Sequence, residues 1–335
     1  MSRDPLICRL AGWATVLTLI VVVLGAWVRL SDAGLGCPDW PGCYGQLGAP
    51  EGSTQIQRAN AAFPDRPVET AKAWKEMAHR YVAGALGVLV AAMAIAAWVR
   101  RRRGTPVVLP TVLLALVTFQ ALLGMWTVTL LLKPLIVLAH LLGGLTVLAL
   151  LAWLTLSHVQ RLPYLAHPRV LRGFVALGLV VLVGQIVLGG WTSTNYAALA
   201  CPDFPTCQGQ WWPDTDFDSA FVPWHGLGID YEGGVLSGDA RTAIHLSHRI
   251  GAIVASLTIG ALALVCMWPG RARGLQIAGA CVLALLAVQL ALGVSAVIWR
   301  LPLPVATAHN GGAAILLLSL VALLRLLTRS TPDAR

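Results

Sequence analysis

The chain has 335 residues, of which 57% are hydrophobic and 12% are charged. This composition excludes an ordinary soluble globular domain, because several apolar runs are long enough to cross a lipid bilayer. The formal net charge is +9, and membrane topology accounts for it without a nucleic-acid partner. The sequence therefore predicts an all-α, multi-pass membrane protein that sits in the lipid bilayer and binds no nucleic acid.

Eight apolar runs are each near the roughly 20 residues that a helix needs to span the hydrocarbon core. The first run follows only a short flank, has no A-x-A-like cleavage site and reaches spanning length, so we expect a retained helix and not a signal peptide. No Arg- and Ser-rich transit peptide precedes it, which favours a bacterial plasma membrane over an organelle. The predicted transmembrane helices are 10–30, 77–99, 106–130, 135–157, 170–192, 242–267, 274–298 and 303–327.

Arginine residues gather between alternate runs and near both termini. The positive-inside rule places these segments together on the cytoplasmic side, so both termini are predicted to be cytoplasmic. The two long loops, 31–76 and 193–241, then lie on the outer side and contain thirteen of the fifteen acidic residues. The arginines are Arg3, Arg9, Arg100–Arg103, Arg161, Arg169, Arg172, Arg271, Arg273, Arg325 and Arg329.

The second half of the sequence repeats the first half. An offset of 164 residues aligns LGAWVRLSDAGLGCPDWPGC with LGGWTSTNYAALACPDFPTC, and an offset of 169 aligns EMAHR with HLSHR and AHLLGG with AHNGG. Since each copy contains four helices, the two copies run in the same direction. We predict two tandem, pseudo-symmetric four-helix bundles: residues 1–160 with outer loop 31–76, and residues 161–335 with outer loop 193–241.

One histidine lies on each even-numbered predicted helix, a few residues inside the outer boundary: His79, His140, His248 and His309. An ionisable residue inside a membrane is costly, so a functional role is expected. A single such residue is also consistent with a neutral histidine bonded to a carbonyl group, but four at one depth favour ligands. Two histidines facing each other across a bundle supply both axial ligands of a haem iron. Zinc or copper is less favoured, because no third ligand recurs at that depth.

Glycines and arginines accompany these histidines. A glycine follows a leucine in each odd-numbered helix, and in three of the four a glutamine stands four residues earlier. Other glycines follow the histidines and either make room for a flat macrocycle or serve ordinary helix packing. Arg80 and Arg249 are expected to pair with haem propionates or to reach lipid headgroups. The two groups of glycines are Gly25, Gly124, Gly189 and Gly293, and Gly84, Gly87, Gly143, Gly144, Gly311 and Gly312.

The outer loops contain the heptapeptides CPDWPGC at 37–43 and CPDFPTC at 201–207. Two prolines in each copy remove backbone donors and fix φ, so we expect ordered loops and not helix interior. In an oxidising compartment the C-x5-C spacing favours a disulfide within each loop. Zinc binding by the four cysteines is the alternative, although C-x2-C pairs are more usual for that metal.

Together these motifs resemble those of the haem A synthases, over residues 10–327. The resemblance implies a membrane oxidoreductase that oxidises a ring methyl of haem O to a formyl group by successive hydroxylations. The product, haem A, serves haem-copper terminal oxidases. The segments that carry the resemblance are VRLSDAGLGCPDWPGCYGQ (28–46), EMAHR (76–80), AHLLGG (139–144), ACPDFPTCQGQ (200–210), HLSHR (245–249) and AHNGG (308–312).

The resemblance also implies roles for individual residues. Glu76 matches an outer glutamate that the family requires for function, and the loop cysteines match two disulfides. The implied partners are a haem O synthase that hands over the substrate and the assembly of a terminal oxidase. The implied sites are His79 and His140 for the substrate haem O, His248 and His309 for a haem b cofactor, and the pairs Cys37–Cys43 and Cys201–Cys207.

Two other functions stay open at this point: a dihaem b-type electron carrier that reduces quinone, and a haem transporter built from parallel repeats. Glu76 corresponds to His245 in the second half. A dihaem carrier would be expected to have two equivalent sites, so this difference in residue type argues against it. A transporter has no need of paired axial histidines. His245 is a candidate to support the permanent haem, the Trp-rich segment 211–225 has no assigned role, and homo-oligomerisation stays open.

Overall fold

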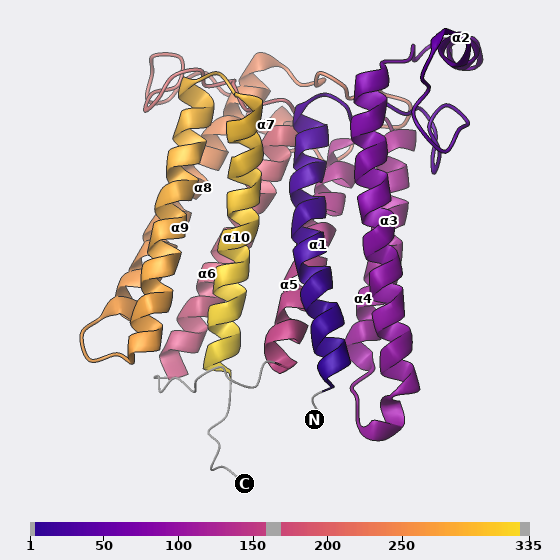
Figure 1. Cartoon of the computed structure of the whole chain (residues 1–335). Coiled ribbons are helices and arrows are strands. Elements are labelled where there is room, and N and C mark those ends of the chain that lie inside the picture. The colour runs from indigo at the N-terminus through magenta and orange to yellow at the C-terminus, as the bar shows by residue number, and fades with distance from the viewer. Residues whose placement is uncertain (1–3, 159–168, 329–335) are drawn as a thin grey trace.

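The computed structural model describes residues 4–158 and 169–328, and the regular elements in these ranges are helices. Eight helices are long and apolar enough to cross a membrane (Figure 1). The predicted all-α fold and the eight predicted spans are confirmed, while Arg3, Arg161 and Arg329 lie outside the described residues. The long helices are α1 (Pro5–Leu30), α3 (Thr70–Val99), α4 (Val108–Thr129), α5 (Pro134–His158), α6 (Arg169–Thr194), α8 (Gly238–Met267), α9 (Arg273–Ile298) and α10 (Leu303–Leu327).

Three helices, α1, α3 and α8, begin four or more residues before their predicted apolar runs. α1 begins directly after Asp4, whose carboxylate accepts a hydrogen bond from the backbone N of Leu6 at 3.0 Å. Such a cap, followed by proline in the first helical position, favours a helix start. α3 begins at Thr70, because its first turns contain polar side chains that a hydropathy run leaves out. The outer loop predicted as 31–76 therefore ends in a helix, and Glu76 is a helical residue.

The long helices form two rings of contacts that follow the two halves of the sequence. α1 and α4 each pack against α3 and α5, and α6 and α9 each pack against α8 and α10. The rings meet where α10 packs against α1 and α5, and where α5 packs against α6. The apolar core of the second ring also includes Leu145 and Leu148 of α5. Helices α1 and α5 of the first half therefore pack against helices of both halves.

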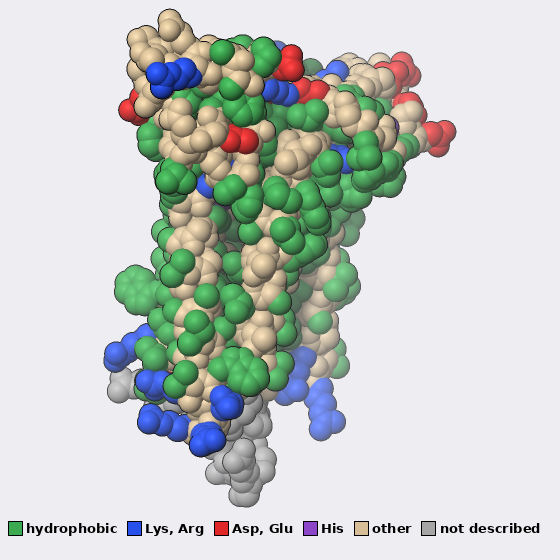
Figure 2. All heavy atoms as spheres, turned by 90° about the vertical axis from the view of Figure 1, so that its right-hand side faces the viewer, with side chains coloured by type: hydrophobic (Ala, Val, Ile, Leu, Met, Phe, Trp, Pro, Cys, Tyr) green, Lys and Arg blue, Asp and Glu red, His purple; other side chains and the backbone are tan. Residues whose placement is uncertain are grey.

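Charged side chains are separated between the two ends of the helices. α1 begins and α10 ends at the same end of the molecule (Figure 1). In Figure 2 the charged side chains at that end are Lys and Arg, the acidic side chains lie at the opposite end together with further Lys and Arg, and a mainly hydrophobic band lies between the two ends. The positive-inside rule assigns the arginine-rich end to the cytoplasm, and this orientation stays a prediction.

Both heptapeptide loops fold around their aspartate. The carboxylate of Asp39 accepts hydrogen bonds from two successive backbone N–H groups, the first that of Tyr44 at 2.6 Å. The carboxylate of Asp203 accepts the equivalent pair, the first from Gln208 at 2.6 Å. An aspartate that bonds the backbone ahead of it stabilises a turn. The sequence repeat in the loops is therefore a repeat of structure.

The loop cysteines form disulfides within each loop. Cys37 is joined to Cys43, and Cys201 is joined to Cys207. The predicted pairing is confirmed, and the zinc alternative is wrong because each sulfur is bonded to another sulfur. Across residues 4–158 and 169–328 there is also no cluster of three or more His, Cys, Asp or Glu side chains placed to hold a metal ion.

Candidate functional site

A cavity of about 740 Å³ lies within the N-terminal half. Its walls come from α1, α3, α4 and α5, and residues of α6 and α10 also line it. Glu76, His79 and His140 all line this cavity, so the three residues predicted to form the substrate site lie around one space. The volume is within the roughly 300–1,000 Å³ range of cofactor and small-molecule sites, and the walls are mainly apolar, as such sites are.

Each of the four predicted histidine ligands lies against a glycine of a neighbouring helix. A Cβ atom built on that glycine would lie between 2.9 and 3.5 Å from the Cε1 atom of the imidazole. The glycine that recurs in α1, α4, α6 and α9 therefore makes room for the histidine ring. The pairs are Gly25 with His79, Gly124 with His140, Gly189 with His248, and Gly293 with His309.

Two of the three recurring glutamines, Gln185 and Gln289, bond the backbone of the histidine helices. Gln185 donates from Nε2 to the carbonyl O of His248 at 3.0 Å and lies 3.1 Å from Nδ1 of the same residue. Gln289 donates to the carbonyl O of His309 at 2.9 Å. A side-chain donor to a carbonyl inside an apolar helix bundle fixes the register of the two helices at that point.

A second group of glycines accommodates these glutamines. A Cβ atom on the glycine three residues after the histidine would lie at most 2.3 Å from a glutamine side-chain atom, which no real Cβ tolerates. This corrects the macrocycle interpretation for two of the glycines that follow histidines. The glycines packed on glutamine are Gly143, Gly251 and Gly312, whereas Gly84, Gly87 and Gly144 line the cavity.

The residues of the cavity fit a porphyrin. The Nδ1 atoms of His79 and His140 are buried and have no hydrogen-bond partner among the described residues. Because buried polar atoms are normally paired, such nitrogens beside a cavity point to a bound group. Two imidazoles in an apolar helix bundle are a donor set for haem iron. His248 and His309 repeat the same glycine contacts in the other half.

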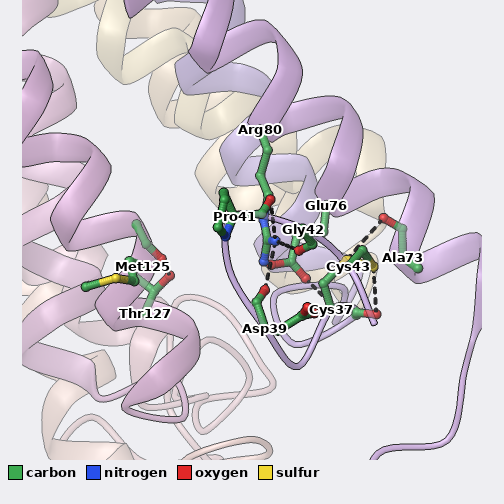
Figure 3. Close-up of polar contacts among 12 residues, drawn as sticks. Cys37, Asp39, Pro41, Gly42, Cys43, Ala73, Glu76, Arg80, Met125 and Thr127 are labelled. Atoms are coloured by element: carbon green, nitrogen blue, oxygen red, sulfur yellow. Dashed lines mark hydrogen bonds and ion pairs between the residues drawn. A yellow bond between two sulfur atoms is a disulfide. The ribbon is translucent and has the colours of Figure 1, made fainter. Parts of the chain in front are cut away.

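Glu76 is buried where α3 meets the first heptapeptide loop (Figure 3). One carboxylate oxygen accepts a hydrogen bond from the backbone N of Cys37 at 2.8 Å, and the other pairs with the guanidinium of Arg80. That guanidinium also donates to the carbonyl oxygens of Asp39 and Gly42. Arg80 therefore holds the loop on the helix, an arrangement different from the propionate and headgroup contacts expected from the sequence.

The second half repeats this arrangement with a different acceptor. Nδ1 of His245 accepts a hydrogen bond from the backbone N of Cys201 at 3.1 Å. Arg249 donates to the carbonyl oxygens of Cys201 at 3.0 Å and of Asp203 and Thr206 at 2.7 Å each. His245, whose role was open, thus holds the second loop in the way that Glu76 holds the first.

Part of the second outer loop lies on the first half of the molecule. Lys133, in the turn between α4 and α5, is 1% exposed, and burial without a carboxylate partner lowers the pKa of its ammonium group. The sequence repeat gave no signal for this region, because the segment around Trp224 has no counterpart in the first loop. The contacts are Lys133 with Gly226 O and the Trp224 ring, Tyr231 N with Leu131 O, and Arg66 with Asp230 and Glu232.

Sequence reasoning missed one charged residue of the cavity. Among the described residues that line it, the charged ones are Arg29, Glu76 and Arg80. The self-alignment contains the signal for Arg29, because Ser193 occupies the equivalent position in the second half. A charge present in only one of two repeated halves marks a difference in what the halves do.

The chain has relatives of known name. The family model described as "Cytochrome oxidase assembly protein" matches residues 9–321. A protein of Shewanella oneidensis named "Heme A synthase" is 45% identical over 308 residues, which cover 91% of this chain and 92% of the relative. A protein of the same name from Caulobacter vibrioides is 27% identical, and the match covers 92% of this chain and 92% of the relative. Another from Shouchella clausii is 31% identical, and the match covers 62% of this chain and 65% of the relative.

Proposed function

The chain belongs to the family of cytochrome oxidase assembly proteins, and from this premise we propose that it is an enzyme that converts haem O into haem A for haem-copper terminal oxidases. In this reaction an oxidant from outside the chain takes four electrons as one ring methyl of the porphyrin is converted to a formyl group, by successive hydroxylations followed by loss of water. The observation that carries the proposal is the cavity of the N-terminal half, where two histidines and a buried glutamate line one apolar space.

Haem O binds in the N-terminal half, residues 1–160, with His79 and His140 as the ligands of its iron. The mainly apolar walls suit a hydrophobic porphyrin. Gly25 and Gly124 set the position of the two imidazole rings, because each ring packs directly on its glycine. The protein therefore orients the substrate through rings that are themselves held by close packing.

The C-terminal half, residues 161–335, holds a haem b between His248 and His309. When bound, this group supplies one-electron redox chemistry. The chain contributes fixed ligands: Gln185 and Gln289 bond the backbone of the two histidine helices. Glycines pack on both imidazole rings.

Glu76 accepts the proton that leaves as the substrate methyl is oxidised. Its carboxylate lines the cavity and is oriented by the backbone N of Cys37 and the guanidinium of Arg80. A general base fixed in this way contributes about 10²–10⁴-fold to a rate. His245 has no such function, because it is the equivalent of Glu76 in the half that keeps its haem.

The protein resides in a bacterial plasma membrane with both termini in the cytoplasm and the two long loops outside. The arginine-rich end carries the cytoplasmic positive charge that this orientation requires. A haem O synthase supplies the substrate, and assembly of a terminal oxidase consumes the product.

A dihaem electron carrier is the competing function, because the four histidine–glycine contacts are alike in both halves. Extraction and chromatography of the haems from purified protein separates the two. An enzyme of this kind contains haem O or haem A beside haem b, and it forms haem A when supplied with haem O and an oxidant, either an electron acceptor or dioxygen together with an electron donor. Haem b alone in both halves, with no haem A formed, would contradict the proposal.

A further inference from the structure

Arg29 lies in the last turn of α1, at the outer end of the helix. Its side chain is 15% exposed and lines the same cavity as His79 and His140. A guanidinium group in this position faces the space that the proposed function gives to the porphyrin. It is also fixed, because it stacks over the ring of Tyr196 at 4.2 Å.

The protein leaves part of the hydrogen-bonding capacity of Arg29 unused. Nη2 donates to the carbonyl O of Ser193 at 2.8 Å. Nη1 lies 3.9 Å from the carboxylate of Asp32, a distance at the limit of an ion pair, and that carboxylate is 59% exposed. Nε is buried and has no partner among the described residues. A guanidinium has five N–H donors, so further acceptors can be bound.

The charges along the cavity wall do not balance. Glu76 and Arg80 form an ion pair, and the remaining contacts of Arg80 go to loop carbonyls. Arg29 therefore gives the wall a net positive charge. A porphyrin with two propionates brings negative charge, and guanidinium binds carboxylate through parallel N–H donors.

Comparison of the two halves shows that Arg29, unlike Arg80, has no arginine equivalent in the second half. Arg80 and Arg249 are equivalent, and both hold heptapeptide loops. Arg29 has no such equivalent, because Ser193 stands in its place in the second half. A residue needed only to build a bundle would be expected in both.

We propose that Arg29 binds a propionate carboxylate of the porphyrin substrate and so fixes the rotation of the ring in the cavity. This inference deepens the proposed function and rests on it. The alternative is that Arg29 only joins the two halves through its bond to the carbonyl of Ser193.

The test combines a variant with a modified ligand. Full-length protein that already carries haem b is titrated with haem O and with its dimethyl ester, which lacks the carboxylates, and binding is followed by the optical difference spectrum. The wild type should bind the free acid about tenfold or more tightly than the ester, since a charge-assisted hydrogen bond is lost. Arg29→Gln should bind both ligands with equal, weakened affinity, and Arg29→Lys should recover part of the preference for the free acid.

Arg66→Gln is the matched control, because Arg66 pairs with Asp230 and Glu232 outside the cavity. It should keep the full preference for the free acid. If Arg29→Gln keeps that preference, or if the wild type binds the ester as tightly as the acid, the inference is overturned. The second outcome needs no variant and so does not depend on whether Arg29→Gln folds.

Formation of haem A by the wild type distinguishes failure of the Arg29 assignment from failure of the proposed function. A wild type that forms haem A but shows no dependence on the carboxylates overturns only the assignment of Arg29. A wild type that neither binds nor converts haem O overturns the proposed function, and the assignment of Arg29 falls with it.

Discussion

The two halves of the molecule share a framework and differ in the charges added to it. In both halves histidine rings pack on glycines, an arginine holds a heptapeptide loop, and the residue three before the first histidine accepts a bond from the first loop cysteine. In the first half that residue is Glu76 and in the second it is His245. Arg29 likewise stands against Ser193. The shared part is what the two proposed porphyrin sites would need, and the differences indicate where chemistry was added to the proposed substrate half.

The outer loops also differ between the halves. The first loop stays over its own half, whereas the second extends across to the α4–α5 turn of the first half and to Arg66. The outer side of the proposed substrate half is therefore built from both loops. A change in the second loop is expected to reach the first half, but not the reverse.

The largest expected effect comes from removing a histidine, because a haem without an axial ligand loses its low-spin state. His309→Ala should remove most of the low-spin b-type absorbance from folded protein. His140→Ala should leave that absorbance in place and abolish binding of haem O. The spectra of the two variants, recorded with and without added haem O, check this difference. Equal spectra for the two variants would contradict the assignment of haem b to the second half.

Exchange of Glu76 for glutamine tests the proposed role of Glu76 as the general base. Glu76→Gln keeps an oxygen that can accept from the backbone N of Cys37, so the loop should stay in place and haem b should be retained. Formation of haem A should fall by about 10²-fold or more, since the base is lost. His245→Gln is the matched change in the second half and should leave the rate within a few-fold of wild type. Near-normal haem A production by Glu76→Gln would eliminate its role as the base.

The sequence was sufficient to predict the eight spanning helices, for physical reasons, and three residues named from it, Glu76, His79 and His140, line one cavity. Spanning helices need long apolar runs, and the internal repeat placed the four histidines at one depth. The function of Arg80 was not predictable, because its acceptors are backbone carbonyls of a loop and carbonyls have no sequence signature. Gly143 and Gly312 lie on Gln120 and Gln289, and the sequence left macrocycle contact and helix packing open for them for a similar reason: a small residue shows that something lies close, but not what lies there.

The disulfides should contribute equally to stability and unequally to activity. Loss of either pair should lower the free energy of unfolding by about 2 kcal/mol, because each closes a short loop of similar length. Only the Cys37→Ser/Cys43→Ser variant should also slow haem A formation, since the backbone N of Cys37 orients Glu76. Thermal melting and turnover of this variant and of Cys201→Ser/Cys207→Ser provide the comparison. Equal loss of activity in both would show that the loops act only through overall stability.

An effect on stability alone is expected where glycine accommodates glutamine. Gly251→Val should destabilise the second half by about 1–3 kcal/mol, the usual cost of overpacking, because a Cβ there would lie 2.3 Å from Oε1 of Gln185. In the first half, the positions equivalent to Gln185 and Gly251 are Val21 of α1 and Val82 of α3. The double variant Gln185→Val/Gly251→Val copies that pair and should recover part of the lost stability.

Gly184→Ala is the control for this prediction, because no atom lies within 4 Å of a Cβ at that position. It should melt at the wild-type temperature or slightly above it. A double variant less stable than Gly251→Val would mean that the glutamine does not set the need for glycine.

The smallest effect concerns Asp203 and the difference between the two loops. The Thr206 hydroxyl and the backbone N–H groups of residues 208 and 209 lower the pKa of the Asp203 carboxyl from 3.8 to about 2. In the first loop glycine, Gly42, stands in place of Thr206.

Because the pKa is lower in the folded loop than in the unfolded chain, the ionised carboxylate stabilises the turn above the ordinary value, and this contribution is lost as the pH falls through about 2. Thr206→Ala removes one donor, so the pKa of Asp203 should rise and the turn should open at a higher pH. Protection of the amide of Gln208 against hydrogen exchange, followed from pH 5 to pH 2 and corrected for the intrinsic rate, measures this shift. An unchanged profile in Thr206→Ala would mean that the backbone donors alone lower the pKa of Asp203. The first loop has the equivalent backbone donors to Asp39.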